Sequence, residues 1–190
     1  MSKNEQNLTI ADEELMELSA NGDKKAFYIL VKRWNKSIVN FFYRNVGNQE
    51  IAEDLAQEVF INIWKATNYK TKSSFYCWIY RIAKNKLIDF YRKHKIDSIP
   101  IDENMQVLET EKFNGLEDKL IQKEEELMVR NAINTLSEEQ KLILILSKYQ
   151  KLAYEDIAKV LDCSKENVKV KVFRAINAFG KKFKELYGKQ

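Results

Sequence analysis

The sequence has 190 residues, of which 45% are hydrophobic and 32% are charged, and its formal net charge is +4. One proline and five glycines are too few for the frequent turns of a sheet protein, so the composition predicts an all-α protein. A single histidine, His94, and two widely spaced cysteines, Cys77 and Cys163, exclude a His-rich metal site, a zinc ribbon and a C-x-x-C redox pair. We therefore expect no metal and no cofactor.

Cellular location is predicted from the N-terminal residues and the apolar runs. Residues 1–7 lack the features of a signal peptide, and the longest apolar run, 142–146, is far shorter than a membrane span. Two unpaired cysteines are typical of a reducing compartment. These features predict a cytoplasmic protein with no direct membrane insertion.

Charge divides the chain into three parts. Residues 1–97 hold 16 lysines and arginines against 12 acidic residues, and residues 129–190 hold 13 against 7. Between them, residues 98–128 hold 3 basic against 9 acidic residues. We interpret this pattern as two small helical domains, 1–97 and 119–190, joined by a flexible acidic linker over 98–118.

The first part predicts a helical bundle. Acidic residues open a short helix at 12–14, and the Asn-Gly-Asp sequence at 21–23 ends it. The next helix ends near 45–48 and carries a stripe of core residues at three- and four-residue spacings: Phe27, Leu30, Val31, Trp34, Ile38 and Phe41.

A third helix is predicted over 50–66. Its buried face holds Ala52, Leu55, Ala56, Val59, Phe60 and Ile63. A second face shares the spacing i, i+3, i+4 and i+7 and holds Asp54, Gln57, Glu58 and Ile61. The pattern alone favours an ordinary solvated face, and a docking surface is the alternative.

A polar loop over 68–74 precedes a fourth helix over 75–93. Its core face holds Trp78, Ile79, Ile82, Ala83, Leu87 and Phe90. Cations on another face lie near Tyr69, Tyr76, Trp78 and Tyr80, which suits single-stranded nucleic acid because cations follow phosphates while aromatic rings stack on bases. The alternative is that the aromatic residues belong to the core.

The C-terminal part predicts a helix-turn-helix. A capping box at 137–140 opens one helix, a short helix follows over 152–161, and Ser164 caps a longer helix that continues to about 186. The last helix is predicted to bury Val168, Val172, Ala175, Ile176 and Phe179 and to expose a basic face, as recognition helices do in the major groove. A solvated basic face is the alternative.

Taken together, these residues resemble a known family. The sequence AEDLAQEVF at 52–60, WIYRIAKN at 78–85 and DFYR at 89–92 resemble region two of sigma-70-type factors. The capping box, YEDIA at 154–158 and the basic helix after Ser164 resemble region four. The order and spacing of the motifs over about 11–186 resemble the extracytoplasmic-function (ECF) group of bacterial RNA polymerase sigma factors.

The resemblance implies a role for each set of residues in promoter-specific initiation. Residues expected to dock on core RNA polymerase are Asp54, Gln57, Glu58 and Ile61. Residues expected to capture and melt the −10 element are Tyr69, Lys72, Ser73, Ser74, Trp78, Arg81, Lys84, Asn85, Asp89 and Arg92. Residues expected to contact the −35 duplex are Ser164, Lys165, Asn167, Lys169, Lys171 and Arg174.

The resemblance also implies partners, and the sequence differs from the family pattern at some positions. We expect core RNA polymerase, promoter DNA and an anti-sigma factor, often membrane-anchored, with this chain a monomer when free and not an enzyme. Asp162 stands where the family often has glycine, and Val170 stands where it often has serine. A stand-alone helix-turn-helix regulator and a helical nuclease are the alternatives.

Free protein is expected to bind DNA weakly. Two basic domains on a flexible linker have no fixed spacing, so their effective concentration on one promoter is low. Core polymerase is expected to supply the spacing.

Overall fold

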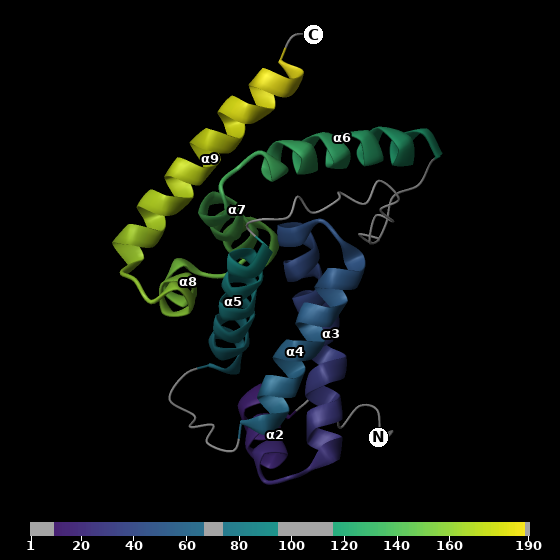
Figure 1. The fold of residues 1–190 in the computed structure, drawn as a ribbon, viewed down its shortest axis with the longest axis vertical. Helices are drawn as coiled ribbons and strands as arrows, with labels where there is room; N and C mark the ends of the chain where they lie inside the picture. The colour runs from purple at the N-terminus through teal and green to yellow at the C-terminus, as the bar shows by residue number, and fades with distance from the viewer. Residues whose placement is uncertain (1–9, 67–73, 95–115, 189–190) are drawn as a thin grey trace.

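The computed structural model describes residues 10–66, 74–94 and 116–188, with side chains in the last range described from residue 124. Within these ranges the chain forms helices and no strand (Figure 1), which confirms the predicted all-α class. Most of the predicted linker lies outside the described residues. The last three residues assigned to it, 116–118, already belong to a helix.

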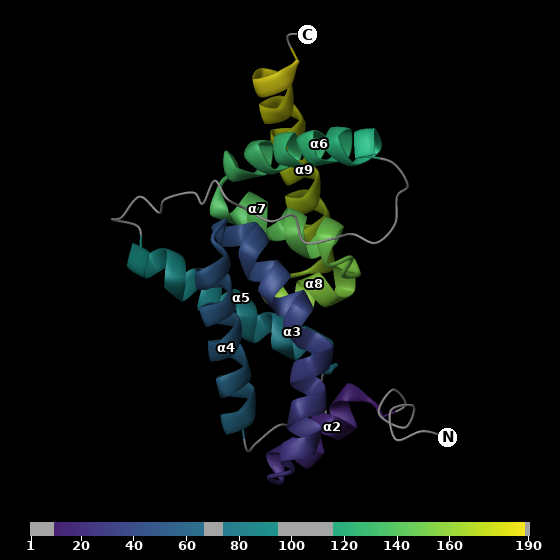
Figure 2. The ribbon, with the colours of Figure 1, turned by 90° about the vertical axis from the view of Figure 1, so that its right-hand side faces the viewer.

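Within the described residues, the N-terminal domain contains four helices. They are α2 (Asp12–Ala20), α3 (Lys24–Val46), α4 (Gln49–Lys65) and α5 (Phe75–His94). Helices α3 and α4 pack along each other, and Figure 2 shows α5 running across both. The four predicted N-terminal helices are confirmed, and each boundary that the sequence placed lies within two residues of the observed one.

Local sequence explains how α3 turns into α4. Gly47 ends α3 with φ of 77°, a left-handed conformation that glycine adopts without steric cost. Asn48 then caps α4, because its side-chain oxygen accepts a hydrogen bond from the backbone N–H of Ile51 at 3.0 Å. This short connection holds the two helices side by side and turns the second face of α4 outward.

The C-terminal domain consists of α6 (Leu116–Asn134), α7 (Glu138–Leu144), the π-helix η1 (Ile145–Tyr149), α8 (Tyr154–Leu161) and α9 (Lys165–Tyr187). Helix α9 packs against α6, α7 and α8. Neither α6 nor the π-helix was predicted. The π-helix continues α7 without a break, so sequence periodicity merges the two.

The predicted helix-turn-helix is confirmed between α8 and α9. Asp162 adopts the left-handed conformation, with φ of 54°, that aspartate tolerates better than most residues. Ser164 caps α9 by accepting a hydrogen bond from the backbone N–H of Asn167 at 3.2 Å. The capping box of Ser137 and Gln140 at the start of α7 is also confirmed.

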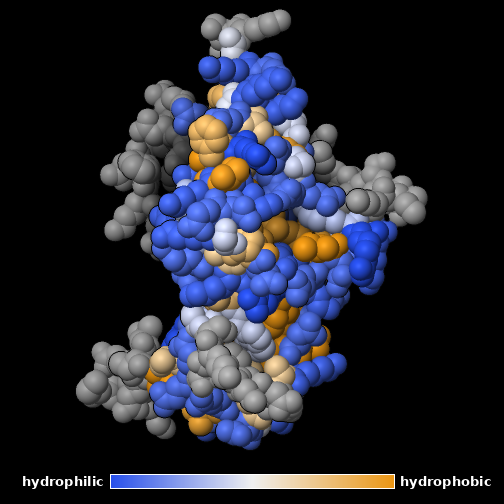
Figure 3. Space-filling view, turned by 90° about the vertical axis from the view of Figure 1, so that its left-hand side faces the viewer, coloured by the Kyte–Doolittle hydropathy of each residue, from blue (hydrophilic) through white to orange (hydrophobic). Residues whose placement is uncertain are grey.

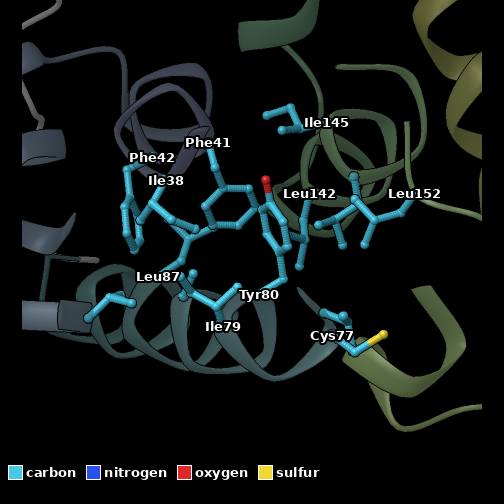
Figure 4. Packing of buried hydrophobic residues seen from close by; sticks show 14 of the residues in the cluster. Ile38, Phe41, Phe42, Cys77, Ile79, Tyr80, Leu87, Leu142, Ile145 and Leu152 are labelled. Carbon is cyan, nitrogen blue, oxygen red and sulfur yellow. The ribbon is translucent and has the colours of Figure 1, made fainter. Parts of the chain in front are cut away.

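The two domains share one continuous hydrophobic core. Figure 4 shows the ring of Tyr80 on α5 lying between Phe41 on α3 and Leu142 on α7. Contacts between α5 and α8 and between α3 and η1 extend this core. The expectation of two domains without a fixed spacing is therefore wrong for this structure, because apolar faces on both domains bury each other.

Most residues of the predicted core stripes are buried, and one prediction is wrong. Ile176 was assigned to the core of α9 but is 40% exposed, whereas Val168, Val172 and Ala175 are buried. Ile176 lies at the edge of that stripe. The neighbouring helices cover a narrower strip of α9 than its apolar pattern suggests.

Candidate functional site

The second face of α4 is exposed to solvent. All four residues predicted to dock on polymerase are exposed, and Ile61 keeps 49% of its surface in contact with solvent. Glu58 accepts a hydrogen bond from Lys86 Nζ on α5 at 2.7 Å, which fixes the position of its carboxylate. The face therefore combines two carboxylates, an amide and an exposed isoleucine: Asp54, Glu58, Gln57 and Ile61.

On α5, the residues predicted to contact the −10 element form an outer face. Arg81, Asn85 and Arg92 are exposed, and Arg92 donates a hydrogen bond to Asp89 at 2.9 Å. Ser74, which directly precedes α5, is also exposed. The other predicted residues of the preceding loop lie outside the described residues: Tyr69, Lys72 and Ser73.

Three predicted −10 residues, Lys84, Trp78 and Asp89, are half-buried. The pKa of Lys84 is lowered, first by burial and then by the positive charge of Arg81. The ring of Trp78 lies 5.9 Å from that of Phe75, centroid to centroid, at the base of the helix. Trp78 therefore packs against the core on one side and is exposed on the other. This position is compatible both with a core residue and with a residue that stacks on a base.

The interpretation of Tyr76 and Tyr80 as free stacking residues is wrong for this structure. Tyr80 is 1% exposed, and its hydroxyl donates a hydrogen bond to Gln150 Oε1 at 2.6 Å. The hydroxyl of Tyr76 donates to the backbone carbonyl of Gln150 at 3.1 Å. Both rings also pack against Trp34. The two tyrosines therefore join the domains, and burial raises the pKa of each.

A further contact between the domains joins α5 to α8. The thiol of Cys77 donates a hydrogen bond to Asp156 Oδ1 at 3.3 Å, and the guanidinium of Arg81 donates to the carbonyl oxygen of Lys159. Cys77 is buried, and burial together with Asp156 raises the pKa of its thiol to about 11. One side of the predicted −10 helix is therefore covered by α8.

This raised pKa predicts different reactivities for the two cysteines. Because the thiolate is the nucleophile, iodoacetamide at pH 7.5 is expected to alkylate half-exposed Cys163 well before Cys77. Peptide mass spectrometry over time measures both rates, and the Cys77 rate is expected to rise as the pH approaches 11. Urea-unfolded protein is the control and is expected to show similar rates. Rapid alkylation of Cys77 in the folded protein contradicts the docked arrangement.

Three more contacts join the domains around the C-terminal end of α3. The guanidinium of Arg44 lies 3.8 Å from the centre of the Tyr149 ring, a cation–π contact. Lys141 Nζ donates a hydrogen bond to the carbonyl oxygen of Asn45 at 3.2 Å, and Arg130 donates to the Tyr43 hydroxyl at 2.6 Å. Sequence reasoning missed all of them, because partners far apart in the chain leave no local pattern.

The N-terminal half of α9 presents the predicted −35 residues. Ser164, Lys165, Asn167, Lys169 and Arg174 are exposed, and Lys171 is half-buried. Lys165 pairs with Glu155 of α8, which raises the pKa of the lysine and lowers that of the glutamate. Lys171 pairs with Glu139 of α7. These pairs connect the start of α9 to α8 and α7, and its outer face remains exposed.

A cavity of about 400 Å³ lies where α5 meets the C-terminal domain. Its lining includes Lys84, assigned to the −10 set, and Lys171, assigned to the −35 set. Apolar side chains such as Ile88 and Leu142 form much of the remaining wall. In this arrangement, the two predicted DNA-binding sets therefore meet at one place.

No cluster of three or more histidine, cysteine, aspartate or glutamate side chains in the described residues has the geometry to bind a metal ion. None of the helices in that part of the chain has the length and apolarity needed to span a membrane.

Comparison with known families and proteins is consistent with this geometry. Residues 30–96 match the family model for sigma-70 region 2, and residues 126–178 match the model for sigma-70 region 4. The RNA polymerase sigma-H factor of Pseudomonas aeruginosa is 34% identical over 189 residues, covering 92% of this chain and 95% of the relative. The ECF RNA polymerase sigma-E factor of Escherichia coli is 29% identical over 191 residues, covering 93% and 96%.

Two solved structures share the fold. CnrH in complex with the cytosolic domain of CnrY aligns with a TM-score of 0.68 and 21% identity, over 90% of this chain and 96% of the other. The sigma factor RpoE of Bartonella quintana, in complex with the anti-sigma factor NepR, aligns with a TM-score of 0.64 and 23% identity, over 84% and 98%. Sequence motifs, family models and a relative matched over nearly its whole length agree, so this chain belongs to the ECF group of the sigma-70 family of RNA polymerase sigma factors.

Proposed function

We propose that three helices divide the work of promoter-specific initiation in this sigma factor. Helix α4 docks on core RNA polymerase, α5 and the loop before it capture and melt the −10 element, and α9 enters the major groove of the −35 element. The observation that carries the proposal is that every described residue of the three predicted sets is exposed or half-buried on one of these elements. The N-terminal domain within 1–97 thus holds the first two functions, and 119–190 holds the third.

Each face has the chemistry that its proposed partner requires. Carboxylates beside an exposed isoleucine on α4 suit a protein surface with a basic rim and an apolar centre. Arginines and lysines on α5 suit the phosphates of a melted strand. The exposed, basic N-terminal half of α9 suits duplex DNA, because recognition helices read base edges with that half.

The proposal includes further properties of the protein. Polymerisation belongs to the core enzyme, and this chain contributes no catalytic centre of its own. It acts in the cytoplasm, is a monomer when free, and binds an anti-sigma factor. Support for the anti-sigma partner comes from RpoE of Bartonella quintana, which was solved with the anti-sigma factor NepR.

Promoter binding requires the two domains to separate. Lys84 and Lys171 line one cavity, yet the −10 and −35 elements lie about 85 Å apart along B-DNA. A single copy in the docked arrangement therefore cannot place both sets on one promoter. Core polymerase is proposed to hold the domains apart. The free protein is then expected to bind DNA weakly because its two domains are docked, and not because a flexible linker leaves their spacing undefined.

Substitutions on α9 and α5 test this division of labour in the holoenzyme. Arg174→Ala is expected to weaken promoter binding by about tenfold to a hundredfold, as removal of a base-reading side chain does. Asn85→Ala on α5 is expected to leave duplex binding intact and to reduce strand opening. Permanganate footprinting of unpaired thymines separates opening from binding.

Lys181→Ala is the matched control, because it removes one exposed positive charge from the C-terminal half of α9. The Lys181→Ala variant is expected to show a small loss of promoter affinity, and to show it only at low salt. If the Arg174 variant bound normally and failed only at strand opening, the assignment of α9 to the −35 duplex would be wrong. Tight, sequence-specific binding by the free protein at physiological salt favours a stand-alone regulator instead.

A further inference from the structure

Helix α9 exposes two apolar side chains within its first nine residues, in the half that is proposed to enter the major groove. Val170 is 45% exposed and Phe173 is 67% exposed. Val170 is two residues from each of the buried residues Val168 and Val172, and two residues along an α-helix correspond to a rotation of about 200°. Val170 therefore lies at the centre of the outer face, opposite the core.

Phe173 lies three residues after Val170, so the two side chains are neighbours on the helix surface. Figure 3 views the side of the molecule on which α8 and α9 lie in Figure 1, and small hydrophobic areas there are enclosed by hydrophilic surface. The pair forms a small apolar spot, which we call the Val170–Phe173 spot. It is too small to be a protein interface on its own.

The charges around this spot indicate a polyanionic partner. Exposed Lys169 and Arg174 flank Val170 along the helix, and residues 164–190 carry eight lysines and arginines against two glutamates. An apolar spot with a basic rim fits the major groove, where phosphates border the base edges. Among the groups that the bases present in that groove, the apolar one is the 5-methyl group of thymine.

We propose that Val170, with Phe173 beside it, contacts the 5-methyl group of thymine in the −35 duplex and so determines part of the promoter preference of this sigma factor. The inference rests on the proposed entry of α9 into the major groove. A valine has no hydrogen-bonding group, so the contact selects thymine by apolar burial alone. Removal of one methyl group is expected to weaken binding about fourfold.

The test uses the holoenzyme and a promoter selected by it from a library randomised in the −35 region. Each thymine in the selected −35 duplex is replaced, one at a time, by deoxyuridine, which keeps the base pair and removes only the 5-methyl group. Wild-type holoenzyme is expected to lose about fourfold in affinity at one or two of these positions. The Val170→Ser holoenzyme is expected to bind the thymine and deoxyuridine promoters with equal affinity at those positions. The Val170→Ile holoenzyme is expected to lose affinity on the same replacement, as wild type does.

Leu186→Ser is the matched control, because Leu186 is another exposed apolar residue on α9, 48% exposed and about four turns beyond Val170. This variant is expected to keep the wild-type dependence on the methyl group. Selected −35 duplexes without thymine, or equal affinity for thymine and deoxyuridine at every position, overturn the inference. So does a Val170→Ser holoenzyme that remains as sensitive as wild type.

Failure of the inference and failure of the proposed function give different results. If α9 does not read the −35 duplex, Arg174→Ala leaves promoter binding unchanged as well. If α9 reads the duplex but the spot contacts protein, Arg174→Ala weakens promoter binding. In that case Val170→Ser and Phe173→Ala change only self-association or partner binding, as measured by light scattering, and the thymine contact is overturned.

Discussion

Replacing Asp54 and Glu58 by lysine is expected to abolish co-elution of this sigma factor with core RNA polymerase. The two carboxylates lie on the exposed face of α4, so the double variant places two positive charges on the face that is proposed to dock on core polymerase. Like charges across an interface cost several kcal/mol, which corresponds to a loss of affinity of at least about a hundredfold. Size-exclusion chromatography of the mixture with core polymerase measures the result.

The fold is expected to survive this double substitution. It removes the exposed ion pair between Glu58 and Lys86, and exposed ion pairs contribute about 0.2–1 kcal/mol to the free energy of unfolding. Circular dichroism at 222 nm checks that the helices remain. Glu124→Lys combined with Glu125→Lys is the matched control, because it makes the same charge change on exposed residues of α6. Undiminished co-elution of the Asp54 and Glu58 variant removes the docking assignment.

A cross-link between α5 and α8 is expected to block promoter opening completely. Cys77 already contacts Asp156 across the two domains, at 3.3 Å from Sγ to Oδ1, so Asp156→Cys places a second thiol beside the natural one. Oxidation then locks the domains together, whereas we propose that promoter binding requires them to separate. The oxidised protein is expected to form open complexes only in proportion to its uncross-linked fraction, and reductant is expected to restore them.

Asp156→Cys is combined with Cys163→Ser, so that Cys77 and the introduced cysteine are the two thiols of the chain. The single variant Cys163→Ser, oxidised in the same way, is the control and is expected to remain active. Recovery on reduction in the same sample excludes misfolding as the cause. Open complexes formed by fully cross-linked protein, or failure of the two thiols to cross-link at all, contradict the docked arrangement and its opening by polymerase.

Local sequence predicted the helices well because local interactions form them. The capping box at Ser137 and the serine cap at Ser164 involve residues within one helical turn, and the apolar stripe of α4 repeats at spacings of three and four residues. The outer faces of α4, α5 and α9 were also predictable from local spacing, because residues opposite a buried stripe lie on the outer side of a helix. These faces supplied the candidate site residues, and the family resemblance supplied their proposed roles.

Residues with two plausible environments could not be assigned from the sequence. Tyr80 could serve either as a base-stacking ring or as a core residue, and its position 70 residues from Gln150 gave no sign of the hydrogen bond between them. Ile176 fits the apolar spacing of α9, yet the neighbouring helices leave it exposed. In each case the answer depends on which helix packs where.

The sequence by itself determined the helical class, the helix-turn-helix and the family, because each depends on residue types at short, regular spacings. The tertiary structure alone decided that the two domains dock, through Tyr80, Cys77 and Arg44. It also decided that Lys84 and Lys171 share one cavity. The physical reason is that docking is the sum of many weak contacts between segments far apart in the chain, and the local sequence of each segment does not show which other segment it contacts.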